Sequence, residues 1–80
     1  MDKSEIKSKV EKITAQVLKV DAKEITPNAN FSFDLGADSM QSIELIAAFE
    51  EEFNISLDEQ KAREVQTVEG AVEFIAGYLK

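Results

Sequence analysis

The sequence predicts an all-α protein: a small four-helix bundle of three longer helices and one short helix, with a long loop between the first two helices. Three observations lead to this prediction. Apolar residues recur at helical spacing in three segments, a residue suited to helix capping precedes each of them, and no segment has the alternating or β-branched pattern of a strand. The 80 residues leave room for one small domain, to which we assign residues 1–80.

The first helix is expected over residues 4–18. Its apolar residues recur at intervals of four, three and four, which places them on one face: Ile6, Val10, Ile13 and Val17. Either Asp2 or Ser4 can cap the start of this helix, and Asp2 forms a capping-box-like pair with Glu5.

Residues 19–37 show no clear period and contain the only Pro, so we expect a long loop there. A loop of this length inside a small domain is usually functional or held down by its own apolar groups. Four residues can hold it to the core: Val20, Ile25, Phe31 and Leu35. Gly36 allows the chain to turn sharply into the next helix.

The second helix is expected to begin at Asp38 and to run to about Phe53. Asp38 as N-cap and Gln41 three residues later form a capping box. At helical spacing one face should be buried: Leu45, Ile46, Phe49 and Phe53. The opposite side mixes apolar and acidic residues, which suits a docking surface: Met40, Glu44, Ala47, Ala48 and Glu51.

Two further helices are expected in the last third of the chain. A short one should run from Asp58 to Glu64. The last one should follow Thr67 as its N-cap, with apolar residues at helical spacing: Val68, Ala71, Val72, Ile75, Tyr78 and Leu79.

Composition excludes several classes of function. The chain has no His and no Cys, and therefore no imidazole base, thiol nucleophile or His/Cys zinc site; we expect no metal. A net charge of −7 repels phosphate backbones, so nucleic acid is not expected as a partner. The longest apolar run, residues 45–49, is too short to span a membrane, and the N-terminus lacks the apolar stretch of a signal peptide. We expect a cytoplasmic protein.

The negative charge lies in the second half of the chain. Residues 1–33 hold six Lys and five acids, whereas residues 34–80 hold three basic residues and eleven acids. The net charges of the two parts are therefore +1 and −8. This asymmetry indicates that the second half meets partners with basic surfaces.

Ser39 stands out because it falls in the first turn of the second helix, directly after the run Asp-Leu-Gly-Ala-Asp at 34–38. Free N–H groups and the positive end of the helix dipole would favour a phosphate attached there. The residues alone also allow a plainer role, since Ser is common at helix starts. A calcium loop starting at Asp34 fails, because Ser39 stands at the required Gly and Leu45 at the bidentate Glu.

Catalysis by Ser39 is not expected. A nucleophilic Ser needs a base and an oxyanion hole, and the chain has neither His nor a Gly-x-Ser-x-Gly motif. Composition leaves a Ser/Lys dyad open, without any motif to support it. An enzyme is therefore the weakest of the hypotheses.

The run Asp-Leu-Gly-Ala-Asp-Ser at 34–39, with Ile-Glu-Leu at 43–45 and Glu-Glu-Glu-Phe at 50–53, resembles the bacterial acyl carrier proteins of fatty acid synthesis. The resemblance runs without gaps from Asn30 to Ile75 and more loosely over the first helix. It implies a carrier without catalysis of its own. Ser39 corresponds to the family's attachment site, which a phosphopantetheinyl transferase modifies with 4′-phosphopantetheine from coenzyme A. The thiol of that arm would hold acyl chains as thioesters and present them to fatty acid synthesis enzymes.

The resemblance also implies two surfaces and a monomeric state. One surface meets basic docking patches of partner enzymes: Asp38, Met40, Glu44, Ala47 and Glu51. The other encloses the acyl chain: Phe31, Ile46, Phe49, Leu57, Ala62, Val65 and Ala71. The plainer alternatives are a solvated acidic face for the first set and core packing for the second.

Several positions depart from the family pattern and leave the partners and the acyl chain length open. Met40 replaces a more usual Leu, and Phe49 replaces a smaller aliphatic residue. The others stand where acids are common: Phe33, Gln41, Lys61 and Arg63. Two alternatives to a fatty acid carrier therefore stand beside it: a carrier for a specialised lipid or polyketide pathway, and a non-acylated helical interaction subunit.

Overall fold

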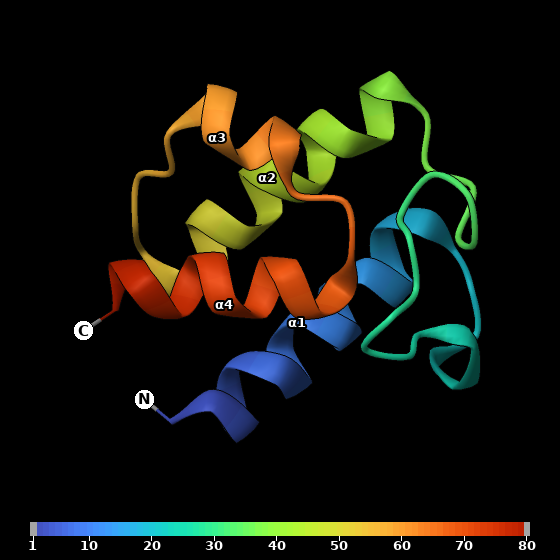
Figure 1. Ribbon diagram of the computed structural model, residues 1–80, viewed down its shortest axis with the longest axis horizontal. Coiled ribbons are helices and arrows are strands. Elements are labelled where there is room, and N and C mark those ends of the chain that lie inside the picture. Colours follow the sequence, from blue (N-terminus) through green and yellow to red (C-terminus); the bar gives the residue numbers. More distant parts are fainter. Residues whose placement is uncertain (1, 80) are drawn as a thin grey trace.

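The first and longest helix, α1, spans Lys3–Leu18 of the computed structural model, which describes residues 2–79 (Figure 1). A long connection containing the 3-10 helix η1 (Ala22–Glu24) leads to α2 (Ser39–Phe53). The short α3 (Glu59–Glu64) and then α4 (Val68–Tyr78) complete the described chain. The predicted all-α class, with three longer helices, one short helix and a long first loop, is confirmed.

Each α-helix starts on a side chain that caps it. The N-cap oxygen accepts a hydrogen bond from the backbone N–H three residues later, at 2.8–3.0 Å: Asp2, Asp38, Asp58 and Thr67. Such a bond satisfies one of the N–H groups that a helix start leaves without a partner. Of the two caps considered for α1, Asp2 is the one used, and α1 begins one residue before the predicted start.

Two helix ends use left-handed residues. Lys19 follows α1 with φ 55°, and Asn54 follows α2 with φ 54°. Their N–H groups bond back to Ala15 O and Glu50 O, so the chain leaves each helix in a turn with its carbonyl groups partly satisfied.

The core lies where α1 packs against α2 and α4, while α3 contacts α2 and buries no residue completely. In the view of Figure 1, α4 runs across the middle of the molecule, with α1 below it and α3 above it. Three residues of the predicted α1 stripe are buried, but Val17 is half-buried, and Thr14 and Leu18 complete the face. The buried apolar residues of the helices are Ile6, Val10, Ile13, Leu18, Leu45, Phe49, Phe53, Val68, Ala71, Val72 and Ile75.

The long loop is held down by apolar side chains, as predicted for Ile25, Phe31 and Leu35. Val20 is only half-buried, whereas Ala29 and Ala37 are buried although the apolar pattern did not single them out.

Backbone bonds also join this loop to the start of α4. Phe31 N donates to Gln66 O at 2.9 Å, and Val68 N donates to Ala29 O at 3.1 Å. Asn30 and Thr67 thereby form an isolated antiparallel bridge. These bonds anchor the loop that leads to α2 to the start of α4, and this anchoring helps to position the beginning of α2.

Candidate functional site

Ser39 is the first residue of α2, and its side chain is exposed. The residue before it, Asp38, accepts a hydrogen bond from Gln41 N at 2.8 Å, while its own N–H donates to Gln41 Oε1 at 3.1 Å. This is the predicted capping box, with both halves present. The hydroxyl of Ser39 therefore stands on a helix start that the neighbouring side chains keep in place.

The approach to Ser39 is a tightly bonded turn. The side-chain oxygen of Asn30 accepts from Ser32 N and Phe33 N, both at 2.9 Å, and Asn30 N donates to Asp34 Oδ2 at 2.7 Å. Gly36 then adopts φ 75°, a conformation that residues with a Cβ rarely take. These hydrogen bonds and the Gly36 conformation therefore define the course of the loop before Ser39. This agrees with the sharp turn predicted at Gly36.

The five residues predicted to face partners share one exposed surface around the start and outer side of α2. Asp38, Glu44, Ala47 and Glu51 are exposed, and Met40 is 71 % exposed. Ala48, which the helical spacing placed on this side, is half-buried and packs against the core, so that part of the prediction is wrong. At about 100° per residue Ala48 lies nearer the edge of the buried sector than the centre of the outer face.

Ile43 belongs to the same outer surface and was missed by the sequence reasoning, although its side chain is 50 % exposed. It follows Met40 by three residues and precedes Ala47 by four, so the three are neighbours on the helix. That spacing was the signal that could have found it. The outer surface of α2 is therefore more apolar than predicted.

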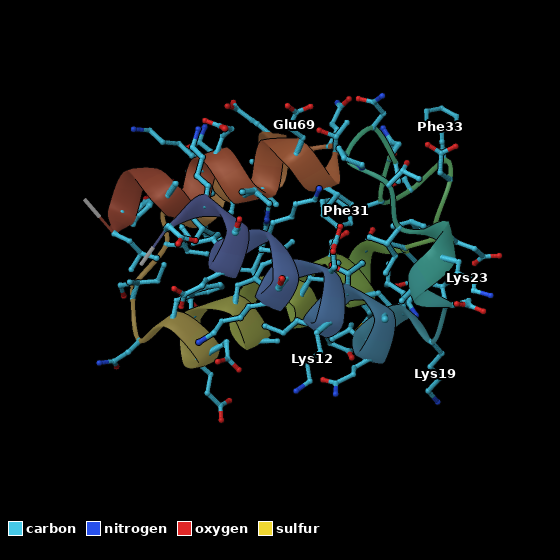
Figure 2. The ribbon with its side chains drawn as sticks, turned by 90° about the horizontal axis from the view of Figure 1, so that it is seen from below. Lys12, Lys19, Lys23, Phe31, Phe33 and Glu69 are labelled. Carbon is cyan, nitrogen blue, oxygen red and sulfur yellow. The ribbon has the colours of Figure 1, made fainter. Side chains whose placement is uncertain are left out.

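A cavity of about 270 Å³ opens between α2, α3, α4 and the loop before α2. All seven residues predicted for the acyl pocket line it: Phe31, Ile46, Phe49, Leu57, Ala62, Val65 and Ala71. Figure 2 shows the Phe31 side chain turned toward the interior. Ser42, which lies one turn after Ser39 on α2, also lines the cavity, so the cavity reaches the same end of α2 as the exposed hydroxyl.

Other lining residues were not predicted. Leu45, Phe74 and Ile75 add apolar surface, and Phe74 could have been found from its place three residues after Ala71. The polar lining comes from the loop before α2, from α2, from α3 and from the segment between α3 and α4: Asn30, Ser32, Ser42, Arg63 and Gln66. Sequence periodicity carries no signal for such a polar border, because it depends on how the loop folds over α2.

The segment between α2 and α3 is held by two side chains. Glu50 Oε2 accepts from Leu57 N at 2.8 Å, and the Tyr78 hydroxyl accepts from Asp58 N at 2.9 Å. The Tyr78 ring meets the Phe74 ring edge to face, with 5.2 Å between centroids. One wall of the cavity is therefore linked to the N-cap of α3 through two aromatic rings.

The two basic residues of α3 differ in their surroundings. Both side chains are exposed, but Arg63 donates to Glu59 Oε1 at 2.6 Å within the helix and lines the cavity border, whereas Lys61 does not line the cavity. An exposed pair of this kind contributes little stability, so the Arg63 guanidinium can exchange its partner.

The chemistry open to this site is that of an exposed hydroxyl at a helix start. The first-turn N–H groups and the helix dipole favour a phosphate ester on it. Within residues 2–79, no three His, Cys, Asp or Glu side chains gather in a way that could hold a metal ion. No helix of that same stretch has both the length and the apolarity to cross a membrane.

Comparisons with known proteins also indicate a group attached through a phosphate ester. A family model described as "Phosphopantetheine attachment site" matches residues 8–75. The chain is 44% identical over 77 residues to "Acyl carrier protein" of Porphyromonas gingivalis, covering 96% of this chain and 99% of that protein. It is 44% identical over 75 residues to "Acyl carrier protein" of Thermosynechococcus vestitus, covering 94% and 93%.

A plant relative is longer than this chain. The identity to "Acyl carrier protein 2, mitochondrial" of Arabidopsis thaliana is 41% over 78 residues, which is 98% of this chain and spans 62% of the length of that protein.

Proposed function

The chain belongs to the acyl carrier protein family, and from that premise we propose that Ser39 carries its 4′-phosphopantetheine arm. The protein is a carrier and not an enzyme, and its cofactor is 4′-phosphopantetheine. When attached, the arm supplies a thiol on which acyl chains are held as thioesters. We take residues 1–80 as one carrier domain.

One observation carries the choice of Ser39: its exposed hydroxyl begins α2 at the end where the cavity opens. Of the other five Ser residues, Ser42 is half-buried and donates its hydroxyl to Asp38 O at 3.0 Å. Ser4 also lies in the first turn of a helix, but no residue of α1 lines the cavity. These differences favour Ser39 over Ser42 and Ser4.

The attachment is a phosphoryl transfer from coenzyme A. Ser39 Oγ attacks the phosphorus that bears the pantetheine group, a new P–O bond forms, and the pyrophosphate P–O bond breaks to release adenosine 3′,5′-bisphosphate. The hydroxyl proton goes to a base on the phosphopantetheinyl transferase, because this chain has no His. The fixed helix start presents the oxygen to that enzyme in one orientation.

The exposed surface of α2 is proposed to dock the transferase and the fatty acid synthesis enzymes that exchange cargo with the arm. Residues 34–80 carry a net charge of −8, and the exposed carboxylates of Asp38, Glu44 and Glu51 belong to that part. Such charges steer the encounter with a basic patch more than they hold the complex together. Weak contacts suit a carrier that must leave each enzyme.

The cavity is proposed to shelter the acyl chain. An apolar cavity of about 150 Å³ holds a six-carbon ring, so about 270 Å³ has room for roughly ten carbon atoms. Its border near Ser42 is polar, which suits the thioester end of a chain whose tail lies among Phe49, Ala71 and Phe74.

We also propose that the protein serves fatty acid synthesis, that it works in the cytoplasm and that it is a monomer. Lys61 and Arg63 on α3 favour a second candidate, a carrier for a specialised lipid or polyketide pathway. The acyl chains found by mass spectrometry on protein purified from its natural host decide between the two. Saturated chains of graded length support fatty acid synthesis.

Intact mass spectrometry tests the attachment site. The purified chain is incubated with coenzyme A and a broad-specificity phosphopantetheinyl transferase. We expect a mass increase of one phosphopantetheine in the wild type and in the matched variant Ser42→Ala, and none in Ser39→Ala. Modification of Ser39→Ala at the wild-type rate would contradict the proposal.

A further inference from the structure

Large apolar side chains are exposed around Ser39. Phe33 is 92 % exposed, Met40 71 % and Ile43 50 %, and they are three of the four such side chains in the part of the chain that the structure describes. The fourth, Tyr78, is on α4. We call Phe33, Met40 and Ile43 the apolar patch. Exposed apolar groups gathered beside a functional group mark an interaction site more often than chance exposure does.

Phe33 is the most exposed member of the patch, and hydrogen bonds hold its backbone in place. Its N–H donates to Asn30 Oδ1 at 2.9 Å, and the carbonyl of the preceding Ser32 accepts from Gly36 N at 3.2 Å. Phe33 lies in the loop that leads to α2, six residues before Ser39, and like Ser42 in the first turn of α2 it lines the cavity. Figure 2 shows the Phe33 side chain projecting away from the body of the protein.

We propose that Phe33 is an apolar anchor that enters an apolar cleft on the phosphopantetheinyl transferase, beside the cleft in which Ser39 reacts. The inference rests on the proposed attachment at Ser39. Asp34, Asp38 and Glu44 are exposed around the patch, so the cleft should have a basic rim. The backbone at Phe33 is held in place before binding and a Phe side chain has few rotatable bonds, so little freedom is lost on binding, which makes it a good anchor.

The transferase is the partner that this position fits best. It must bring its active site to Ser39 Oγ itself, whereas enzymes that act on cargo meet the end of a long arm. Surface next to Ser39 is therefore covered whenever the transferase acts. A second copy of this chain is a poorer fit, because a two-fold contact through the patch would place Asp34, Asp38 and Glu44 against the same carboxylates.

The test measures the rate of modification of the apo chain by the phosphopantetheinyl transferase from the same genome, at several chain concentrations and at low and high salt. The variants are Phe33→Ala, Phe33→Glu and the conservative Phe33→Leu, with Asn28→Ala, at an exposed position of the same loop outside the cavity lining, as the matched control. Glu44→Gln serves as the electrostatic reference. Using the apo chain removes any contribution from contacts between Phe33 and the arm.

We expect Phe33→Ala to raise KM about tenfold, Phe33→Glu to raise it further, and Phe33→Leu to stay within about threefold of the wild type, since a buried apolar anchor contributes on this scale. The loss from Phe33→Ala should persist at high salt, whereas the loss from Glu44→Gln should shrink. Asn28→Ala should behave as the wild type. Because Phe33 is exposed, all variants should unfold at the wild-type temperature.

Two results would overturn the inference: a KM for Phe33→Ala within a factor of two of the wild type, or a loss that Asn28→Ala shares. Self-association of the wild type that Phe33→Glu abolishes, seen by sedimentation, would assign the patch to a second copy and also overturn it. In each case the wild type is still modified at Ser39. Failure of the wild type to be modified at all would instead contradict the proposed function.

Discussion

Filling the cavity from α3 should remove the stabilisation that a loaded acyl chain provides. Ala62 is half-buried and lines the cavity, so Ala62→Leu adds three carbon atoms to that wall. Leu is nearly as good a helix former as Ala, so α3 itself should persist. Gln60 is exposed on the same helix, and Gln60→Leu is the matched control that adds the same side chain outside the cavity.

The stabilisation by a loaded acyl chain can be estimated from the number of methylenes that the cavity buries. Burial contributes about 0.8 kcal/mol per methylene, so about six methylenes of an eight-carbon chain give roughly 5 kcal/mol as an upper limit. Ordering the chain lowers this to about 2–3 kcal/mol. For a domain of this size about 1 kcal/mol shifts Tm by about 4–8 °C, so the octanoyl-loaded wild type should melt roughly 10–20 °C above the unloaded holo form.

Thermal unfolding followed by circular dichroism measures these shifts in matched loaded and unloaded samples. Gln60→Leu should keep the wild-type shift, and Ala62→Leu should lose most of it. In the wild type the shift should grow with chain length up to roughly ten carbons and then level off, because the cavity is then full. A full shift in Ala62→Leu, or no shift in the wild type, would refute the assignment of this cavity to the acyl chain.

Three further predictions concern the cap, the charges and the α2–α3 segment. Asp38→Ala should destabilise the protein by about 1 kcal/mol in urea unfolding because α2 loses its N-cap, whereas Asp38→Asn should lose much less; equal losses would contradict the capping role. Glu44→Lys should slow modification by the transferase, and the difference should shrink at high salt, while Glu5→Lys on α1 should have little effect; a slowdown independent of salt argues against steering. Tyr78→Phe should lower stability by about 0.5–1.5 kcal/mol in urea unfolding because Asp58 N loses its acceptor, and an unchanged midpoint would show that this hydrogen bond contributes nothing.

The helices could be predicted because each depends on local signals. Apolar spacing located α1, α2 and α4. The predicted caps Asp38 and Thr67 placed the starts of α2 and α4 to within a residue, as did the predicted start at Asp58 for α3. The same spacing placed Ala48 wrongly, because the edge of a buried face depends on which helix packs beside it. Helical period alone does not contain that information.

The loop before α2 was the part that the sequence could not resolve. Its three-residue helix η1 and its bridge to Thr67 arise from backbone bonds between segments far apart in the chain. Such contacts leave no periodic pattern in the residues. Phe33, by contrast, stands where the family commonly has an acid, and its side chain is 92 % exposed.

The candidate site depends both on signals in the sequence and on contacts between segments far apart in the chain. Ser39 and the seven residues predicted for the acyl pocket come from the resemblance to carrier proteins, and their roles stay predictions. The structure adds that the seven residues share one cavity and that Ser42 joins this cavity to the end of α2 that bears Ser39. The polar border was missed because it becomes visible only when the loop is placed against α2, whereas the helical spacing from Ala71 could have located Phe74.

The central claim is that the only thiol of the working protein is one attached through Ser39. The chain has no Cys, so a thiol reagent counts arms without interference. We predict no reactive thiol in the apo chain, one for each chain after treatment with coenzyme A and transferase, and none again once an acyl group has been loaded. The Ser39→Ala variant should show no thiol at any stage. A thiol that appears in Ser39→Ala, or acyl loading that leaves the thiol of the wild type free, would contradict the account.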